Sequence, residues 1–330
     1  MILEQKTDTF HILICTKNRV MKIDIVFSFR NEENNIPELV RRTVQVMNSL
    51  EDVEYEMIFV NDDSKDESFN TLTEFQKDYP ISIINMSRRF GVGPCVLAGF
   101  EYSQGDAVVY MDSDLQDPPE LIPKLIEKFR NGAEIVHTTR TEREGESGLK
   151  MWFTKQAYRI INSISEVELP SNTGDFKLLS RKAKDSILNT NEYDPYIRGL
   201  AVWVGYKQEF VYYKREKRFS GITHFSIFGK GPFNEFIRGL TAYSAVPLYL
   251  ALFIGFITVL ISMGIIIYSL LTKLIGISAP GASGILISMA FFNGVLLITN
   301  GIIGIYISKI YYQVKGRQRY IINSIYKSKK

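Results

Sequence analysis

Asp112, Asp114 and Gln116 lie at alternate positions directly after a short apolar run. The run AVVYM at 107–111 is rich in Val and aromatic residues and follows a Gly-Asp pair, so it predicts a buried strand that ends at Asp112. Side chains that leave a strand end at alternate positions can converge on one hard cation, which prefers carboxylate and amide oxygens and leaves sites for phosphates. The sequence therefore predicts a site for Mg²⁺ or Mn²⁺ that suits a nucleotide-sugar diphosphate, with two solvated aspartates in a turn as the alternative.

Strand patterns alternate with helix patterns around this motif. The expected strands are IDIVFSF, YEMIFVN, ISIINM, AVVYMD and EIVHTT, and the helices between them cover 34–49, 66–78, 92–103 and 119–130. This alternation predicts an α/β fold with a mostly parallel sheet and helices on both faces. Ligands of such sheets bind at the carboxyl ends of the strands. The polar clusters fall there, at Asn31 and Glu32, Asp62 to Asp66, Ser87 to Arg89, Asp112 to Gln116, and Arg140.

Two long uncharged stretches follow this region. No charged residue occurs from Thr241 to Thr272 or from Leu274 to Ser308, and Lys273 separates the two stretches. Each is longer than the ~20 residues that cross a hydrocarbon core of about 30 Å, so we expect membrane helices at about 246–270 and 284–308. Two buried helices of a soluble core are the alternative, but soluble helices seldom run beyond about 20 residues without a charge.

Basic residues flank the two stretches. They are Lys214, Arg215, Lys217, Arg218, Lys230 and Arg238 before the first, and Lys309, Lys315, Arg317, Arg319, Lys327, Lys329 and Lys330 after the second. By the positive-inside rule, this pattern places the N-terminal domain and both termini in the cytoplasm. Apolar residues at helical spacing within 226–240 predict an amphipathic helix on the lipid headgroups, with packing on the N-terminal domain as the alternative.

The string DSDLQDPPE at 112–120 resembles the metal-binding motif of polyprenyl-phosphate glycosyltransferases in glycosyltransferase family 2. These include GtrB-like bactoprenol glucosyltransferases and dolichol-phosphate mannose synthases. The resemblance runs from about Lys22 to Tyr320 and implies a GT-A-type fold. It rests on RNEENN at 30–35, NDDSKD at 61–66, SRRFG at 87–91, DSDLQDPPE, TTRTEREGES at 138–147, GDFKLLSRKA at 174–183, RGLAVWVGYK at 198–207 and REKRFSGITHF at 215–225.

The resemblance implies roles for individual residues. Metal binding falls to Asp112, Asp114 and Gln116, and donor binding to Asn31, Glu32, Asp62 and Asp112. The metal neutralises the diphosphate as it leaves. For Asp62, an Asx-turn cap is the alternative. Asp175 matches the family position beside the anomeric carbon, as a base or as an orienter of sugar hydroxyls, and we group it with Asp114 as the catalytic residues.

The acceptor requires a positive field more than a base, because a lipid phosphate is already an anion at neutral pH. An arginine fork suits a phosphate bidentately. The basic candidates are Arg140, Arg143, Lys150, Arg215 and Arg218. By resemblance, Arg140 and Arg218 contact the acceptor phosphate, whereas solvated surface charge remains open for the other three.

The expected reaction is inverting transfer of a hexose from a nucleotide sugar to undecaprenyl or another polyprenyl phosphate, for modification of a cell-surface glycan. UDP-glucose is the first choice of donor, and UDP-GlcNAc, UDP-galactose and GDP-mannose are alternatives. A processive polysaccharide synthase would carry a QxxRW signature, but Ile160 follows Gln156 and Arg159 here, and there are two spans. The intact Asp112, Asp114 and Gln116 set argues against a non-catalytic scaffold.

We divide the chain into an N-terminal extension (1–21), a catalytic domain (22–225), a juxtamembrane helix (226–240), two membrane helices (241–308) and a basic cytoplasmic tail (309–330). The chain has 330 residues, a formal net charge of +3 and two cysteines, so a structural disulfide is not expected. Asn293 and Asn300 share a helix face that favours contact with another helix. The expected partners are the nucleotide sugar, the lipid phosphate, a bacterial cytoplasmic membrane and a second copy of the chain, without nucleic acid.

Overall fold

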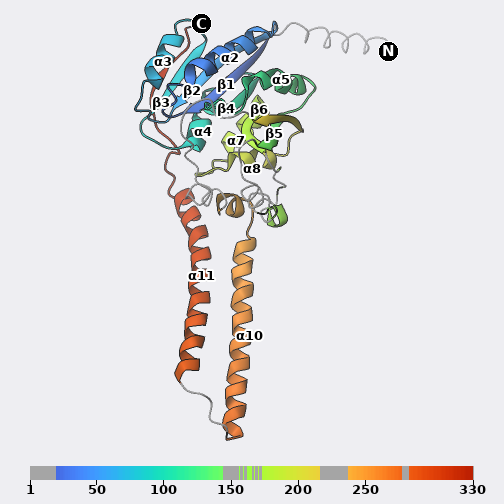
Figure 1. Ribbon diagram of the computed structural model, residues 1–330, viewed down its shortest axis with the longest axis vertical. Helices are drawn as coiled ribbons and strands as arrows, with labels where there is room; N and C mark the ends of the chain where they lie inside the picture. The colour runs from blue at the N-terminus through green and yellow to red at the C-terminus, as the bar shows by residue number, and fades with distance from the viewer. Residues whose placement is uncertain are drawn as a thin grey trace, which may run out of the picture. The chain divides into compact units, whose positions relative to one another are not determined.

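The structure is a computed structural model, and it describes residues 20–143, 173–215, 237–276 and 282–329, together with 156, 159, 162–165, 167 and 170. Eight strands of these residues form one sheet in the order β7-β5-β6-β4-β1-β2-β3-β8 (Figure 1). The strands are β1 (Met21–Phe29), β2 (Val53–Asn61), β3 (Ile81–Met86), β4 (Ala107–Asp112), β5 (Ile135–Arg143), β6 (Thr173–Ser180), β7 (Gln208–Arg215) and β8 (Ile322–Tyr326). Together with the helices described next, this sheet confirms the expected α/β class.

Two layers of helices cover the sheet (Figure 1). The helices are α2 (Ile36–Asn48), α3 (Ser68–Phe75), α4 (Val92–Tyr102), the short η1 (Pro119–Leu121), α5 (Ile122–Arg130), α7 (Arg181–Asn189) and α8 (Ile197–Trp203). Contacts among the helices place α2, α3 and α5 in one layer and α4, α7 and α8 in the other. Helix α4 packs closely on β1 because Gly99 lacks a side chain: a Cβ there would lie 2.3 Å from Val26 Cγ1.

The four strands β3, β2, β1 and β4 run parallel, as the strand and helix pattern predicted. The expected fifth strand, β5, runs in the same direction but does not lie beside β4. Instead, β6 lies between them and is antiparallel to both. Pairing between strands distant in the sequence depends on side-chain packing that the local pattern does not record. The insertion brings Gly174, Asp175 and Lys177 of β6 next to the end of β4.

The C-terminal segment differs from the expected basic tail. Residues Ile322–Tyr326 form β8, which pairs antiparallel with β3 at the edge of the sheet. Figure 1 shows the C-terminus close to β3 and α3. The Ile and Tyr residues of 320–326 are of types enriched in strands, but the basic residues around this segment masked that signal.

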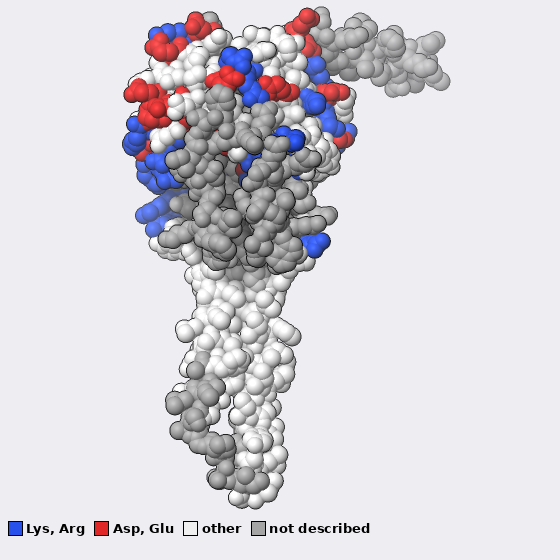
Figure 2. All heavy atoms as spheres, in the orientation of Figure 1, with Lys and Arg blue, Asp and Glu red and all other residues white. Residues whose placement is uncertain are grey.

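The second unit of the chain contains two long apolar helices, α10 (Val246–Leu274) and α11 (Ala282–Val314). They contain stretches long and apolar enough to cross a membrane, Val246–Thr272 and Phe291–Val314, and these stretches are 6% and 0% buried. Figure 2 shows almost no charge on their visible surface. Helices of a soluble core would be mostly buried, so the exposure argues against that alternative. Within this unit, the Tyr306 hydroxyl donates to Ser244 O at 2.8 Å.

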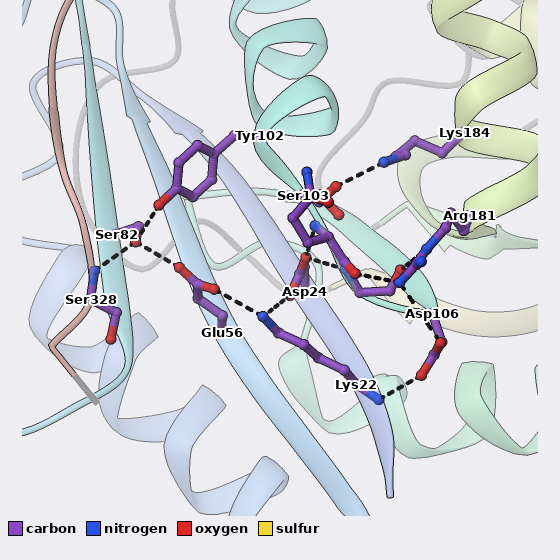
Figure 3. Close-up of polar contacts among 12 residues, drawn as sticks. Lys22, Asp24, Glu56, Ser82, Tyr102, Ser103, Asp106, Arg181, Lys184 and Ser328 are labelled. Carbon is purple, nitrogen blue, oxygen red and sulfur yellow. Dashed lines mark hydrogen bonds and ion pairs between the residues drawn. The ribbon is translucent and has the colours of Figure 1, made fainter. Parts of the chain in front are cut away.

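At the amino ends of β1 and β4, a buried carboxylate fixes the turn that precedes β4. Asp24 Oδ2 accepts the backbone N–H groups of Gln104 and Gly105, each at 2.6 Å (Figure 3). A Cβ at Gly105 would lie 2.8 Å from Ala107 O, so this close approach requires glycine. The turn thereby sets where β4 begins and, at its other end, where Asp112 lies.

Candidate active site

The carboxyl ends of β1, β2, β3 and β4 lie at one edge of the sheet. In the register, Asp112 lies beside Ser28, Phe29 beside Asn61, and Asn61 beside Asn85. The loops that leave these positions contain the residues expected to bind metal and donor. The structure therefore brings these residues to the same edge.

Asp112 is fixed by a buried tyrosine. The Tyr110 hydroxyl donates to Asp112 Oδ1 at 3.0 Å and lies 3.2 Å from Ser28 Oγ. Ser113 Oγ donates to Ser28 O at 3.0 Å, which connects the loop after β4 to β1. Further along the loop, Asp114 Oδ1 accepts the backbone N–H of Gln116 at 3.1 Å. These contacts give the motif a defined conformation.

Carboxylates surround Asp112. Burial and then the negative charges of Asp175, Asp114 and Asp117 raise the pKa of Asp112 to about 7. A divalent cation relieves such repulsion. Among the described residues, no group of three His, Cys, Asp or Glu side chains is arranged to bind a metal. The carboxylate oxygens of Asp112 and Asp114 and the amide oxygen of Gln116 are of the types that Mg²⁺ and Mn²⁺ prefer, and substrate oxygens complete such a coordination shell.

Asp175 of β6 forms a two-pronged ion pair with Arg198 of α8. Arg198 Nε donates to Asp175 Oδ1 at 2.7 Å, and Arg198 Nη2 donates to Oδ2. Burial favours the neutral acid, but Arg198, followed by Lys177 and Arg140, holds the pKa of Asp175 well below its usual range. A carboxylate of such low basicity is a poor proton acceptor at neutral pH. Of its two expected roles, the pairing with Arg198 favours the orientation of sugar hydroxyls over that of a base. Arg198 was not among the residues expected from the sequence, although it lies in the RGLAVWVGYK segment.

Lys177 of β6 is a second residue of the site that was not expected from the sequence. Its side chain is fully buried, and its amino group has no hydrogen-bond partner among the described residues. In the register it lies beside Tyr110 of β4 and His137 of β5. Burial lowers the pKa of Lys177 to about 8, against the opposing effect of Asp175. A lysine inside the apolar part of GDFKLL was the sequence signal for this buried charge.

Asp117 organises the basic side of the site. Its buried carboxylate accepts hydrogen bonds from the Tyr213 hydroxyl and from Arg140 Nη2, the latter at 3.3 Å to Oδ2, and lies 3.4 Å from Arg215 Nε. Arg140 Nε also donates to the Tyr213 hydroxyl at 3.1 Å. A Cβ at Gly174 would lie 2.9 Å from Arg140 Nη2, so glycine leaves room for this guanidinium. Two expected acceptor residues, Arg140 and Arg215, thus meet at the Asp117 carboxylate. Asp117 lies in the DSDLQDPPE motif but was not among the expected site residues.

Asp62 connects two loops. Its Oδ1 accepts the N–H of Phe90 at 2.6 Å, and its Oδ2 accepts the N–H of Gly91 at 3.0 Å. Gly91 has φ +95°, a conformation that favours glycine. The carboxylate therefore supports the loop before α4, a long-range contact and not the local Asx turn that was the alternative.

Asn31 and Glu32 lie in the loop between β1 and α2. Asn31 Oδ1 accepts the N–H of Lys65 at 2.8 Å, and Ser64 Oγ accepts the N–H of Asn31 at 3.0 Å. Ser68 Oγ accepts the N–H of Glu32 at 2.9 Å. These bonds join the loop to the one that follows β2, which contains Asp62.

Some expected residues lie outside this description. Lys150 and Arg218 are not among the described residues, nor are 1–19 and most of the expected juxtamembrane helix. The backbone of Arg143 belongs to β5, but its side chain is outside the description. Of the five expected acceptor residues, the structure therefore describes the side chains of Arg140 and Arg215.

Comparisons with known proteins place this site in context. The glycosyl transferase family 2 profile matches residues 24–188. The chain is 37% identical to an uncharacterized glycosyltransferase of Synechocystis, over 93% of this chain and 96% of that protein. It is 36% identical to the bactoprenol glucosyl transferase of Shigella phage SfX, over 92% and 99%. Among solved structures, glucosyl-3-phosphoglycerate synthase of Mycobacterium tuberculosis, in complex with Mn²⁺, UDP-glucose and phosphoglyceric acid, matches with 19% identity and a TM-score of 0.45 over 67% of this chain and 78% of that one.

Proposed function

This chain belongs to glycosyl transferase family 2 and is a glycosyltransferase, and from that premise we propose that it transfers a hexose from a nucleotide sugar to a polyprenyl phosphate with inversion. The bactoprenol glucosyl transferases of Shigella phages support the lipid carrier, because they match nearly the full length of the chain. Their names also support glucose, so UDP-glucose is the proposed donor. UDP-GlcNAc, UDP-galactose and GDP-mannose are the donors to test against it.

The observation that carries this proposal is the division of charge at the sheet edge. Asp112 and Asp114 leave the end of β4 on an acidic side, and Arg140 and Arg215 meet at Asp117 on a basic side. Two arginines around one carboxylate leave a net positive charge. A sugar diphosphate with its cation suits the first side, and a second phosphate suits the other.

A divalent cation, Mg²⁺ or Mn²⁺, would be held by Asp112, Asp114 and Gln116. When bound, it would neutralise the charge of the departing nucleoside diphosphate. Asp175 would orient the sugar hydroxyls and stabilise positive charge at the anomeric carbon. Arg198 keeps Asp175 ionised for that role.

Asn31, Glu32 and Asp62 would form the nucleotide side of the site. The Asp62 carboxylate already binds the N–H groups of Phe90 and Gly91. We therefore assign it the shaping of the donor loop, and we assign direct contact with the nucleoside to Asn31 and Glu32.

The lipid phosphate needs no catalytic base, because it is already ionised at neutral pH. Arg140 and Arg215 would attract it, with Arg218, Arg143 and Lys150 as further candidates. Asp117 and the Tyr213 hydroxyl hold Arg140 and thus reduce the ordering that phosphate binding requires.

Two membrane-spanning helices would bring this site to its lipid. The apolar stretches of α10 and α11 are long enough and are exposed, and the basic residues before and after them support a cytoplasmic catalytic domain and cytoplasmic termini. The membrane of this proposal is the bacterial cytoplasmic membrane. A homo-oligomer remains part of the proposal.

The proposal is tested with the purified full-length chain in lipid nanodiscs that contain undecaprenyl phosphate. Each radiolabelled nucleotide sugar is supplied with Mg²⁺ or Mn²⁺, and label is measured in the organic phase. We expect UDP-glucose to give the highest transfer. Higher transfer from another donor would replace glucose, and no transfer from any donor would overturn the proposed reaction.

A further inference from the structure

The C-terminal strand, β8, is the outermost strand on the β3 side of the sheet, and this sheet contains the candidate site. In its antiparallel register, Ser324 of β8 lies beside Asn85 of β3. Ser87, just after β3, donates its N–H to Ile321 O at 2.9 Å. The segment that follows the apolar helix α11 in the sequence is therefore part of the catalytic sheet.

A row of side-chain hydrogen bonds begins at Ser324. Asn85 Nδ2 donates to Ser324 Oγ at 3.1 Å, and Asn61 Nδ2 donates to Asn85 Oδ1 at 3.0 Å. Asn61 Oδ1 then accepts the N–H of Ser64 at 2.9 Å. Each asparagine uses both its amide oxygen and its amide nitrogen, so its neighbours fix the orientation of each amide.

The row ends in the loops assigned to the donor. Ser64 Oγ accepts the N–H of Asn31 at 3.0 Å, and Asn31 Oδ1 accepts the N–H of Lys65 at 2.8 Å. Asp62 directly follows Asn61. The orientation of the Asn61 amide therefore affects the loop after β2 and, through Ser64, the loop after β1.

The far end of β8 is also fixed. Ser328 donates its N–H to Ser82 Oγ at 2.9 Å, and Ser82 Oγ donates to Glu56 Oε1 at 2.6 Å (Figure 3). Gln76 Nε2 donates to Tyr326 O at 3.0 Å. With both ends held, Ser324 is a stationary acceptor for Asn85.

We propose that Ser324 and Asn85 are positioning residues for the nucleotide sugar, and that the C-terminal strand thereby supports the donor-binding loops. The inference rests on the proposed function of Asn31, Glu32 and Asp62. Without Ser324 Oγ, the Asn85 amide loses the acceptor that orients it, and without the Asn85 amide, the Asn61 amide loses its own acceptor. In both cases the bond from the Ser64 N–H to Asn61 Oδ1 weakens. We expect the affinity for the donor to fall, because the row of hydrogen bonds from Ser324 to Ser64 does not reach Asp175 or Arg140.

Four variants of the full-length chain test this. Ser324→Ala removes the acceptor hydroxyl, Asn85→Leu interrupts the row, and Ser324→Thr keeps the hydroxyl. Asn323→Ala is the matched control, since it lies on the same strand, is exposed and points to the opposite face. Loss of one hydrogen bond corresponds to a roughly two- to tenfold weakening.

Two measurements are made on each variant. Hydrogen exchange of peptides that cover residues 61–68 reports the Ser64 and Lys65 amides, and calorimetry with UDP and Mn²⁺, without acceptor, reports nucleotide affinity. We expect faster exchange and a two- to tenfold weaker UDP affinity in Ser324→Ala and Asn85→Leu. Ser324→Thr and Asn323→Ala should match the wild type.

Exchange in Ser324→Ala equal to that in Asn323→Ala would overturn the proposal whatever the affinities, and so would faster exchange with unchanged UDP affinity. If the wild-type chain binds no UDP, the proposed donor class is wrong. In that case, exchange alone decides whether the row supports the loops.

Discussion

Arg198 Nε donates to Asp175 Oδ1 at 2.7 Å while Arg198 Nη2 donates to Oδ2, so one guanidinium fork engages both oxygens of the carboxylate. This pair joins α8 to the strand inserted between β4 and β5. It keeps Asp175 charged in a site that already contains Asp112. The arrangement suits a carboxylate that acts by its charge and position.

Asp175→Asn should lower kcat on the order of 100-fold, because a charge that acts mainly in the transition state is lost. Donor affinity, measured calorimetrically, should stay within several-fold. Arg198→Lys should lower kcat less, since a lysine keeps the positive charge but not the planar fork. An equal loss of donor binding in Asp175→Asn would make Asp175 a binding residue.

The same pair predicts a pH dependence of stability. The folded-state pKa of Asp175 is depressed, so its contribution is present above the unfolded-state pKa of about 3.9 and is lost as the pH falls through the folded-state value. The melting temperature of the wild type should therefore fall more steeply than that of Asp175→Asn below about pH 4. Parallel curves would contradict the ion pair.

Asp112→Asn and Asp114→Asn should each abolish turnover and weaken UDP binding in Mn²⁺ to the level that the wild type shows in EDTA. The reason is that each variant removes one of the two carboxylates that would bind the cation. Asp52→Asn is a control, because that exposed carboxylate pairs with Arg130 elsewhere. Full activity in EDTA, or in either site variant, would exclude the metal assignment.

Arg140→Lys and Arg218→Lys should each raise the KM for undecaprenyl phosphate, or lower its turnover, roughly ten- to hundredfold. A lysine does not reproduce a bidentate contact to phosphate. UDP binding without acceptor should barely change. If UDP binding weakens instead, these arginines serve the diphosphate, and the acceptor site lies among Arg143, Lys150 and Arg215.

Single cysteines introduced at Ser278 and at Lys329 should react with a membrane-impermeant maleimide from opposite sides of the membrane. The Lys329→Cys variant should react from the cytoplasmic side. Lys329 is exposed, whereas the backbone of Ser328 is bonded to Ser82. The background chain carries Cys15→Ser, and Cys95 is buried. Labelling of both positions from one side would contradict two membrane crossings.

Local pattern was sufficient to predict the parallel strands and the position of Asp112. Val, Ile and Phe runs buried on both faces mark β1 to β4, and the polar residues after them must lie at one edge. Long-range pairing was not predictable in this way. Nothing local to Asp117 indicates that Arg140 and Arg215, from two other strands, meet at its carboxylate. In the same way, nothing local to Ser324 indicates a place beside Asn85.

The most direct test of the central claim identifies the atom that accepts the sugar. The full-length chain is given labelled UDP-glucose with either undecaprenyl phosphate or undecaprenol, which has the same hydrocarbon chain without the phosphate. We predict that label enters the organic phase only when undecaprenyl phosphate is supplied, and not with undecaprenol. Mass spectrometry of the product should find one phosphate and one hexose per lipid. Transfer to undecaprenol, or a product that retains a diphosphate, would contradict the account.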